Sequence, residues 1–279
     1  HDAKSIFMIP QMLYEQGLVD VVFKKFGNVG FVNTSKNWDN WNMIVNSLQK
    51  TDDAIKIAMV GKYVTLADSY VSVNEALKHA SASIGKSVNI DWIDSETLNG
   101  NLKQLDNFDG VLVPGGFGTR GSEGIIDTAT YALEKNIPYL GICFGFQLAA
   151  VAFGRKMCNL ENANSTEIVA DTKNPIIDLL PEQKDETDMG GSLRLGANEI
   201  KINQDSLAHK IYSSDKIFKR HRHRYEFNTK YREEFLKKGM IFSGESDDEK
   251  RMEILEVPTH KFFLGVQYHP EFNSRPGFP

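Results

Sequence analysis

The sequence PYLGICFGFQ, at residues 138–147, decides the fold. Its first five residues predict a short buried strand, and the residues that follow Cys143 predict a helix that continues to Met157. The turn between them, GICFG, has the G-x-C-x-G form of a nucleophile elbow, a cysteine version of the G-x-S-x-G motif. A buried strand that turns sharply into a buried helix is typical of α/β sheets, so this stretch predicts that architecture.

The chain beyond residue 53 repeats this alternation of strands and helices. Continuous apolar runs predict buried parallel strands at 55–60, 88–93, 110–113 and 138–142. The helices predicted between them are 68–84, 124–135 and 144–157. Alternating patterns predict antiparallel strands at 239–244, 252–257 and 262–268, and the polar stretch 171–191 predicts an exposed connection. The fold class predicted is α/β: a doubly wound, mostly parallel sheet with helices on both faces and additional antiparallel strands.

Residues 1–53 do not share this pattern. Apolar positions at helical spacing predict two short helices over 5–26, separated at Gly17, and a third helix over 38–48. The predicted division is therefore a helical tail and linker at 1–53 and one domain at 54–279. Because the chain begins with His1 rather than Met, we expect it to be a piece of a longer protein.

Composition and charge narrow the range of partners. A formal net charge of -5 and a pI of about 5.8 give no general attraction to nucleic acid or to anionic membranes. Residues 137–154 carry no charge, but Pro138, Gln147 and the glycines there fit a strand, a turn and a buried helix better than a membrane span. Two cysteines are too few for a disulfide scaffold and fit free thiols in a cytoplasmic protein.

The basic run RHRHR at 220–224 is a local exception to the acidic composition. The alternatives are a solvated face, a nucleic-acid contact or a His-x-His metal site at His221 and His223. The run contains no interleaved aromatic side chain for bases to stack on, and the sequence places no third metal ligand nearby. We therefore expect neither nucleic acid nor a metal at this run.

A cysteine nucleophile needs a general base, and the base needs a group that orients it. The segment YHPE at 268–271 supplies both, because residues two apart in an extended chain share a face. Pro270 restricts His269 to extended conformations, so Glu271 is expected to hold one ring nitrogen while the other faces the thiol. Taken alone, Cys143 is as well explained as a core residue and His269 as a surface residue. Together with the elbow they predict a catalytic triad of Cys143, His269 and Glu271.

The oxyanion that forms when a thiolate attacks a carbonyl needs N–H donors. The Phe144 N–H, at the start of the predicted helix, is the natural first donor. The glycine-rich segment PGGFG at 114–118 follows a predicted parallel strand, where ligands bind in such sheets, and Gly115 is expected to be the second donor. The segment also resembles a phosphate loop, but it lacks the Gly-Lys-Ser/Thr ending of that motif.

Taken together, these residues resemble the class I (triad) glutamine amidotransferases and, within that class, the CTP synthase family. Besides the elbow, the segments that carry the resemblance are AMVGKY at 58–63, PGGFGTRG at 114–121, ENANSTE at 161–167, MGGSLRLG at 189–196, RHRHRYE at 220–226 and YHPEF at 268–272. Residues 1–26 resemble the closing helices of the family's synthetase domain. The resemblance covers nearly the whole chain and implies the C-terminal glutaminase domain of a longer enzyme.

The resemblance implies hydrolysis of L-glutamine to glutamate and ammonia, and use of the ammonia by the synthetase domain to convert UTP to CTP. Carried over by position, the glutamine contacts are Gly116, Phe117, Phe144, Gly145, Phe146, Gln147, Glu167 and Arg224. The chemistry agrees, because Arg224 offers a bidentate donor for the α-carboxylate and Glu167 an anion for the α-ammonium. The family commonly has Leu and Met at the positions of Phe144 and Phe146, which leaves the shape of the substrate slot open.

The resemblance also implies partners and cofactors. ATP and Mg²⁺ are expected in the synthetase domain and none in this one, GTP is expected as an allosteric activator acting near Phe117 and 189–196, and the full-length enzyme is expected to be a homo-tetramer. Two alternatives stay open: a stand-alone γ-glutamyl hydrolase or peptidase of the same fold, and a non-catalytic assembly module. The synthetase-like residues 1–26 argue against the first, and the intact triad argues against the second as the sole function.

Overall fold

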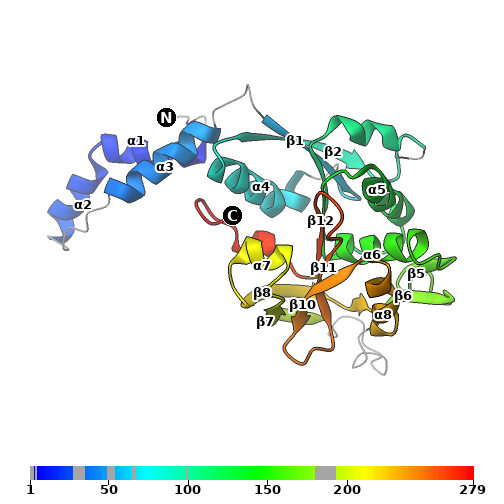
Figure 1. The fold of residues 1–279 in the computed structure, drawn as a ribbon. Helices are drawn as coiled ribbons and strands as arrows, with labels where there is room; N and C mark the ends of the chain where they lie inside the picture. Colours follow the sequence, from blue (N-terminus) through cyan, green and yellow to red (C-terminus); the bar gives the residue numbers. More distant parts are fainter. Residues whose placement is uncertain are drawn as a thin grey trace. The chain divides into compact units, whose positions relative to one another are not determined.

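The computed structural model describes residues 3, 5–27, 35–48, 54–64, 67–98, 100–179 and 193–279 (Figure 1). The chain forms two compact units. The first comprises residues 1–54, 76–88 and 274–279, and the second comprises 55–75 and 89–273. The domain boundary expected after residue 53 stays a prediction, and the division of the structure adds two later segments to the first unit.

The first unit begins with short helices. They are a 3-10 helix at Ile6–Met8, α1 (Ile9–Glu15), α2 (Leu18–Phe26) and α3 (Ser35–Leu48). Gly17 separates α1 from α2 with a φ of 79°, a conformation that favours glycine. The Phe7 carbonyl accepts a hydrogen bond from Trp41 Nε1 at 2.8 Å, and the Phe7 ring packs edge-on against His79. The helices predicted in this part of the sequence are thus present.

The second unit is built on a nine-stranded sheet, in the order β2-β1-β3-β4-β12-β11-β10-β7-β8. Its strands are β1 (Ala54–Gly61), β2 (Ser87–Asp94), β3 (Gly110–Val113), β4 (Tyr139–Ile142), β7 (Arg194–Ile202), β8 (Lys216–His223), β10 (Ile241–Ser246), β11 (Met252–Glu256) and β12 (Phe263–Val266). The pairs β1–β3, β3–β4 and β4–β12 are parallel, and every pair from β12 to β8 is antiparallel. A smaller sheet pairs β5 (Ala163–Ser165), β6 (Asn174–Leu179) and β9 (Tyr225–Phe227).

The remaining helices are α4 (Val71–Ser83), α5 (Ser122–Lys135), α6 (Phe144–Lys156), α7 (Leu207–Tyr212) and α8 (Arg232–Lys237), with 3-10 turns at Ala67–Tyr70, Leu102–Asn107, Thr229–Tyr231 and Pro270–Asn273. Residues 144–154 of α6 are all buried, because α6 packs on β4, β12 and α5 at the centre of the core (Figure 1). Among the described residues, no helix has both the length and the apolar character that crossing a membrane requires. The predicted α/β class, with a parallel centre and additional antiparallel strands, is confirmed.

Two details of the predicted topology are wrong. The strand expected at 262–268 is antiparallel only to β11; on its other side β12 pairs in parallel with β4, with Val266 opposite Ile142. An alternating sequence shows which side chains face the core and does not show which strands lie beside it. The segment 171–191 is not only a connection, because β6 lies within it and buries Ile176 and Ile177; residues 180–192 lie outside the described residues.

The turn from β4 into α6 is possible because Gly141 and Gly145 have no side chains and the backbone can approach closely at both positions. A Cβ on Gly145 would lie 2.3 Å from the Val113 carbonyl oxygen, and a Cβ on Gly141 would lie 2.5 Å from the Gly145 oxygen. The buried Tyr139 hydroxyl donates to the Gly145 carbonyl at 2.9 Å. Side chains are therefore excluded at both positions by backbone atoms that cannot move aside.

Replacing Gly145 by alanine should destabilise the protein by about 3 kcal/mol, because the new methyl group overlaps the Val113 carbonyl. Gly110→Ala is the matched control: its Cβ would meet the Pro138 oxygen at 3.4 Å, an ordinary contact, and should change the free energy of unfolding by less than about 1 kcal/mol. Urea denaturation of both variants measures the difference. Equal effects of the two substitutions would show that the elbow is not sterically constrained.

Candidate active site

Cys143 lies between β4 and α6 in a strained backbone conformation. Its φ is 51° and its ψ is -96°, and a non-glycine residue pays about 1–3 kcal/mol for such a conformation. The Cys143 N–H donates to the Val266 oxygen at 2.7 Å, and its carbonyl accepts from the Gln147 N–H at 3.1 Å. These bonds hold the residue in the elbow geometry that the sequence predicts, at the N-terminus of a helix, where a thiolate is favoured.

His269 and Glu271 form a hydrogen-bonded pair next to the elbow. His269 Nδ1 lies 2.8 Å from Glu271 Oε1, and the His269 backbone N–H donates to the Arg220 oxygen of β8 at 2.9 Å. Burial alone would lower the pKa of His269, but its hydrogen bonds with Cys143 and Glu271, and their charges, raise the pKa to about 10. The structure thus brings the three predicted triad residues together and favours the protonated form of His269.

The loop that follows β3 lies against both the nucleophile and the base. A Cβ on Gly115 would lie 2.8 Å from His269 Cε1 and 3.7 Å from Cys143 Cβ, so only a glycine lets the loop approach this closely. A Cβ on Gly116 would lie 3.5 Å from the Phe144 ring. This placement suits Gly115 and Phe144 as backbone donors to an oxyanion, and that role stays a prediction.

A buried lysine that our sequence analysis did not assign holds the same loop. Lys62, directly after β1, is 4% exposed, and its Nζ donates to the Phe117 carbonyl at 2.9 Å and to the Gly118 carbonyl. From the other side, Glu167 Oε1 accepts from the Gly118 N–H at 2.7 Å. Burial lowers the pKa of Lys62 to about 8, against the opposing charge of Glu167. The available signal was a lysine at the end of a buried strand, which is an unusual place for one.

Glu167 and Arg224 are close enough to influence each other electrostatically, and their role as the pair that binds an amino acid stays a prediction. Burial raises the pKa of Glu167, while its bond to the Gly118 N–H and the charges of Lys62 and Arg224 act to lower it. Arg224 follows β8 and is partly exposed. The Phe117 side chain is 69% exposed, and its ring lies 6.2 Å from that of Tyr63.

Phe144, Phe146 and Gln147, where contacts with glutamine are predicted, are buried residues. The rings of Phe144 and Phe146 belong to the hydrophobic core, so the change from the family's Leu and Met lies beneath the elbow. Gln147 is 3% exposed, and its Nε2 donates to the Tyr225 oxygen and to Gln267. Only their backbone atoms, with those of Gly145, are suited to contact a substrate.

His221, His223 and Glu253 form a buried cluster whose potential ligand atoms lie within 4.8 Å of one another. Glu253 is the third ligand that the sequence could not place, because it comes from β11. His221 Nε2 lies 2.8 Å from Glu253 Oε2, and Arg194 pairs with the other carboxylate oxygen. Burial acts to raise the pKa of Glu253, but His221 and Arg194 hold it below its ordinary value. The carboxylate already has two partners at hydrogen-bond range, so the geometry favours a structural ion network over a metal site.

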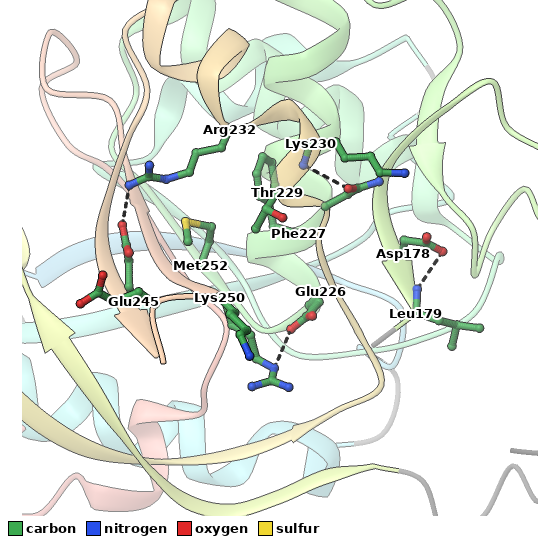
Figure 2. A pocket seen from close by; sticks show the side chains of 13 residues that line it. Asp178, Leu179, Glu226, Phe227, Thr229, Lys230, Arg232, Glu245, Lys250 and Met252 are labelled. Carbon is green, nitrogen blue, oxygen red and sulfur yellow. Dashed lines mark hydrogen bonds and ion pairs between the residues drawn. The ribbon is translucent and has the colours of Figure 1, made fainter. Parts of the chain in front are cut away.

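A cavity of about 590 Å³ in the second unit is lined by none of the predicted triad, oxyanion or glutamine residues. Figure 2 shows its charged wall, in which Arg232 pairs with Glu245 at 2.7 Å. Arg251 also lines the cavity and pairs with Glu226 at 3.3 Å. Because the opposite charges of this wall pair with each other, the cavity presents no single sign of charge to a ligand.

The arrangement of elbow, paired histidine and glycine-rich loop agrees with comparisons to known proteins. The family model "Glutamine amidotransferase class-I" matches residues 65–278, and the chain belongs to this family. Within the family, it is homologous to the glutaminase domain of CTP synthases. It is 37% identical to the structure "Trypanosoma brucei CTPS - glutaminase domain with bound acivicin", with a TM-score of 0.76, covering 81% of this chain and 89% of that one.

Full-length relatives give the same result. The chain is 48% identical to the CTP synthase of Staphylococcus haemolyticus and 45% identical to that of Pyrococcus abyssi, in each case over 100% of this chain and 52% of the relative. It therefore spans about half the length of the relatives it matches. A glutamine amidotransferase structure from Methylobacillus flagellatus, 11% identical with a TM-score of 0.51, shares the fold.

Removing the ammonium that holds the loop should impair catalysis without affecting the triad directly. We expect Lys62→Met to lower kcat/KM for glutamine hydrolysis by about tenfold to a hundredfold. An oxyanion donor raises the reaction rate by a factor of about 10²–10³, and a displaced donor loses much of this factor. Lys103→Met, at an exposed position, should retain wild-type activity.

The pH dependence separates this role from a general loss of stability. As the pH rises through about 8, the wild-type Lys62 ammonium loses its charge and its two bonds to carbonyl oxygens weaken. Wild-type activity should therefore fall on the alkaline side near this pH, and the Lys62→Met variant should lack that step. An identical alkaline limb in both proteins would mean that Lys62 does not control the loop.

Proposed function

We propose that this chain hydrolyses L-glutamine to glutamate and ammonia through a γ-glutamyl thioester on Cys143. The observation that carries the proposal is the joint placement of a strained cysteine at a helix N-terminus, a histidine held by Glu271, and a glycine backbone in contact with both. The family membership supports the same reaction, and the CTP synthase homology favours it over a γ-glutamyl peptidase or an assembly module.

In the first half of the reaction, the Cys143 thiolate forms a bond to the γ-carbonyl carbon, and the carbonyl oxygen becomes an oxyanion held by the N–H groups of Gly115 and Phe144. His269 then protonates the departing nitrogen, so the C–N bond breaks and ammonia leaves. In the second half, His269 takes a proton from water, which attacks the thioester and releases glutamate and the thiolate. Glu271 keeps the imidazole oriented through its bond to Nδ1 in both halves.

One acidic and one basic side chain of the site select the amino-acid end of the substrate. Glu167 binds the α-ammonium of glutamine, and Arg224 binds its α-carboxylate with two parallel hydrogen bonds. Gly116 and Phe117 contact the substrate from the loop that Lys62 holds, and the backbone of residues 144–147 contacts it from the elbow.

We also propose a role in a larger enzyme, on the strength of the relatives. The ammonia is used by a synthetase domain of the same polypeptide, with ATP and Mg²⁺ bound there, to aminate UTP to CTP. GTP activates the glutaminase, and the complete enzyme is a homo-tetramer. Within the segment 189–196, where the GTP signal is expected, residues 189–192 lie outside the described residues. Ammonia release by this chain, measured with and without GTP, tests how much of the activity depends on the rest of the enzyme.

The triad assignment predicts the effect of removing each reactive group. Cys143→Ala should abolish ammonia release, and His269→Ala should lower kcat by about a thousandfold or more, because members of a triad act as a unit. Cys158→Ala is the matched control: this buried thiol, whose pKa burial raises to about 11, should be dispensable for activity. Wild-type turnover by the Cys143 variant would refute the thioester mechanism.

The substrate assignment predicts a selective loss of affinity. Arg224→Lys keeps the charge but loses the two-pronged fit to a carboxylate, so KM should rise about tenfold to a hundredfold while kcat changes little. Arg275→Lys, an exposed arginine in the first unit, should leave both constants unchanged. A KM unchanged by Arg224→Lys would place this side chain outside the glutamine pocket.

A further inference from the structure

A buried amide side chain faces the nucleophile, and the triad does not account for it. Gln267 follows β12, two residues before His269, and is fully buried. Its Nε2 donates a hydrogen bond to Cys143 Sγ at 3.7 Å. The donor is a side chain and is therefore distinct from the backbone amides of the elbow and the loop.

Gln147 fixes the direction in which the Gln267 amide points. Gln147 Nε2 donates to Gln267 Oε1 at 3.2 Å and to the Tyr225 oxygen at 2.8 Å. Because Gln267 Oε1 accepts one of these bonds, the NH₂ end of the Gln267 amide faces the sulfur. The Gln267 backbone is also fixed, since its N–H donates to the Glu253 oxygen at 2.9 Å.

The groups around the sulfur act in opposite directions on the thiolate. From β8, the Arg222 carbonyl lies 3.9 Å from Sγ and accepts a hydrogen bond only from a protonated thiol. From the segment after β12, His269 is the titratable partner of the thiol, with Glu271 behind it, and the Gln267 N–H comes from the same segment. An N–H donor stabilises the charged form of its acceptor, so Gln267 opposes the Arg222 carbonyl.

We propose that Gln267 is a positioning residue that holds the Cys143 side chain and stabilises its thiolate through the N–H···S bond, and that Gln147 orients the Gln267 amide for this purpose. The inference rests on Cys143 being the nucleophile of the proposed hydrolysis. It assigns an indirect role to the Gln147 side chain, beside the contact with glutamine that is proposed for the Gln147 backbone.

Alkylation of Cys143 by iodoacetamide tests the proposal without glutamine, so its outcome is independent of whether the chain hydrolyses glutamine. The rate is followed by mass spectrometry of the Cys143 peptide over a pH series, with Cys158 as an internal reference. The pH of the half-maximal rate in the wild-type protein is the reference value for the variants. Gln267→Met should move this midpoint up by about one pH unit, the size expected for loss of a hydrogen bond to a charged group.

Gln267→Glu should move the midpoint further, because it keeps the side-chain shape but turns a carboxylate toward the sulfur. Gln204→Met removes a surface amide that bonds to Asp215 at 3.0 Å and should match the wild type. In glutaminase assays, Gln267→Met should lower kcat and leave KM nearly unchanged. A general loss of order in the pocket would instead raise KM as well.

One result would overturn the proposal: a midpoint equal to that of the wild type in a Gln267→Met variant that circular dichroism shows to be folded. If Gln267→Met does not fold, the nearly isosteric Gln267→Glu variant provides the test. An unchanged pH midpoint of Cys143 alkylation in that variant would equally contradict an N–H···S bond.

Discussion

The start of α6 passes so close to the Val113 oxygen that residue 145 has no room for a side chain, and the geometry of the site follows from this contact. The contact fixes the first turn of α6, which fixes the direction of the Phe144 N–H and forces Cys143 into its positive φ. Strain of this kind persists only where the surroundings over-determine it. Here the surroundings are the buried helix behind the elbow and the parallel strands on both sides of β4.

The same sheet brings the base to the nucleophile. β4 and β12 are parallel neighbours with Ile142 opposite Val266, so their carboxyl ends, and the residues that follow them, emerge at one edge. The third parallel strand of this group, β3, delivers the glycine-rich loop to the same edge. Three short strands thus place Cys143, His269 and the backbone of Gly115 in contact, although these residues are far apart in sequence.

The elbow, the predicted triad and the parallel strands could be predicted because each depends on local patterns: glycine spacing, a proline beside a histidine, and continuous apolar runs. Gln267 and Glu253 could not, because their contacts come from segments distant in sequence, and no local pattern distinguishes a buried glutamine or glutamate from an exposed one. For Lys62 the position at the end of a buried strand was a signal, but its partners in the glycine-rich loop could not be predicted. The antiparallel pair β7–β8 was missed for a related reason. The basic run 220–224 is typical of a charged surface, whereas His221 and His223 point inward from β8.

One backbone hydrogen bond connects the base to a distant part of the sheet. The His269 N–H donates to the Arg220 oxygen, and β8, which carries Arg220, ends the strand order of the large sheet. The ring of His269 is therefore oriented by Glu271, while its main chain is tethered to an edge strand. A contact that displaces β8 along its own axis would also pull on the His269 main chain through this hydrogen bond. A partner that binds at β8 would then change the rate of turnover without entering the active site.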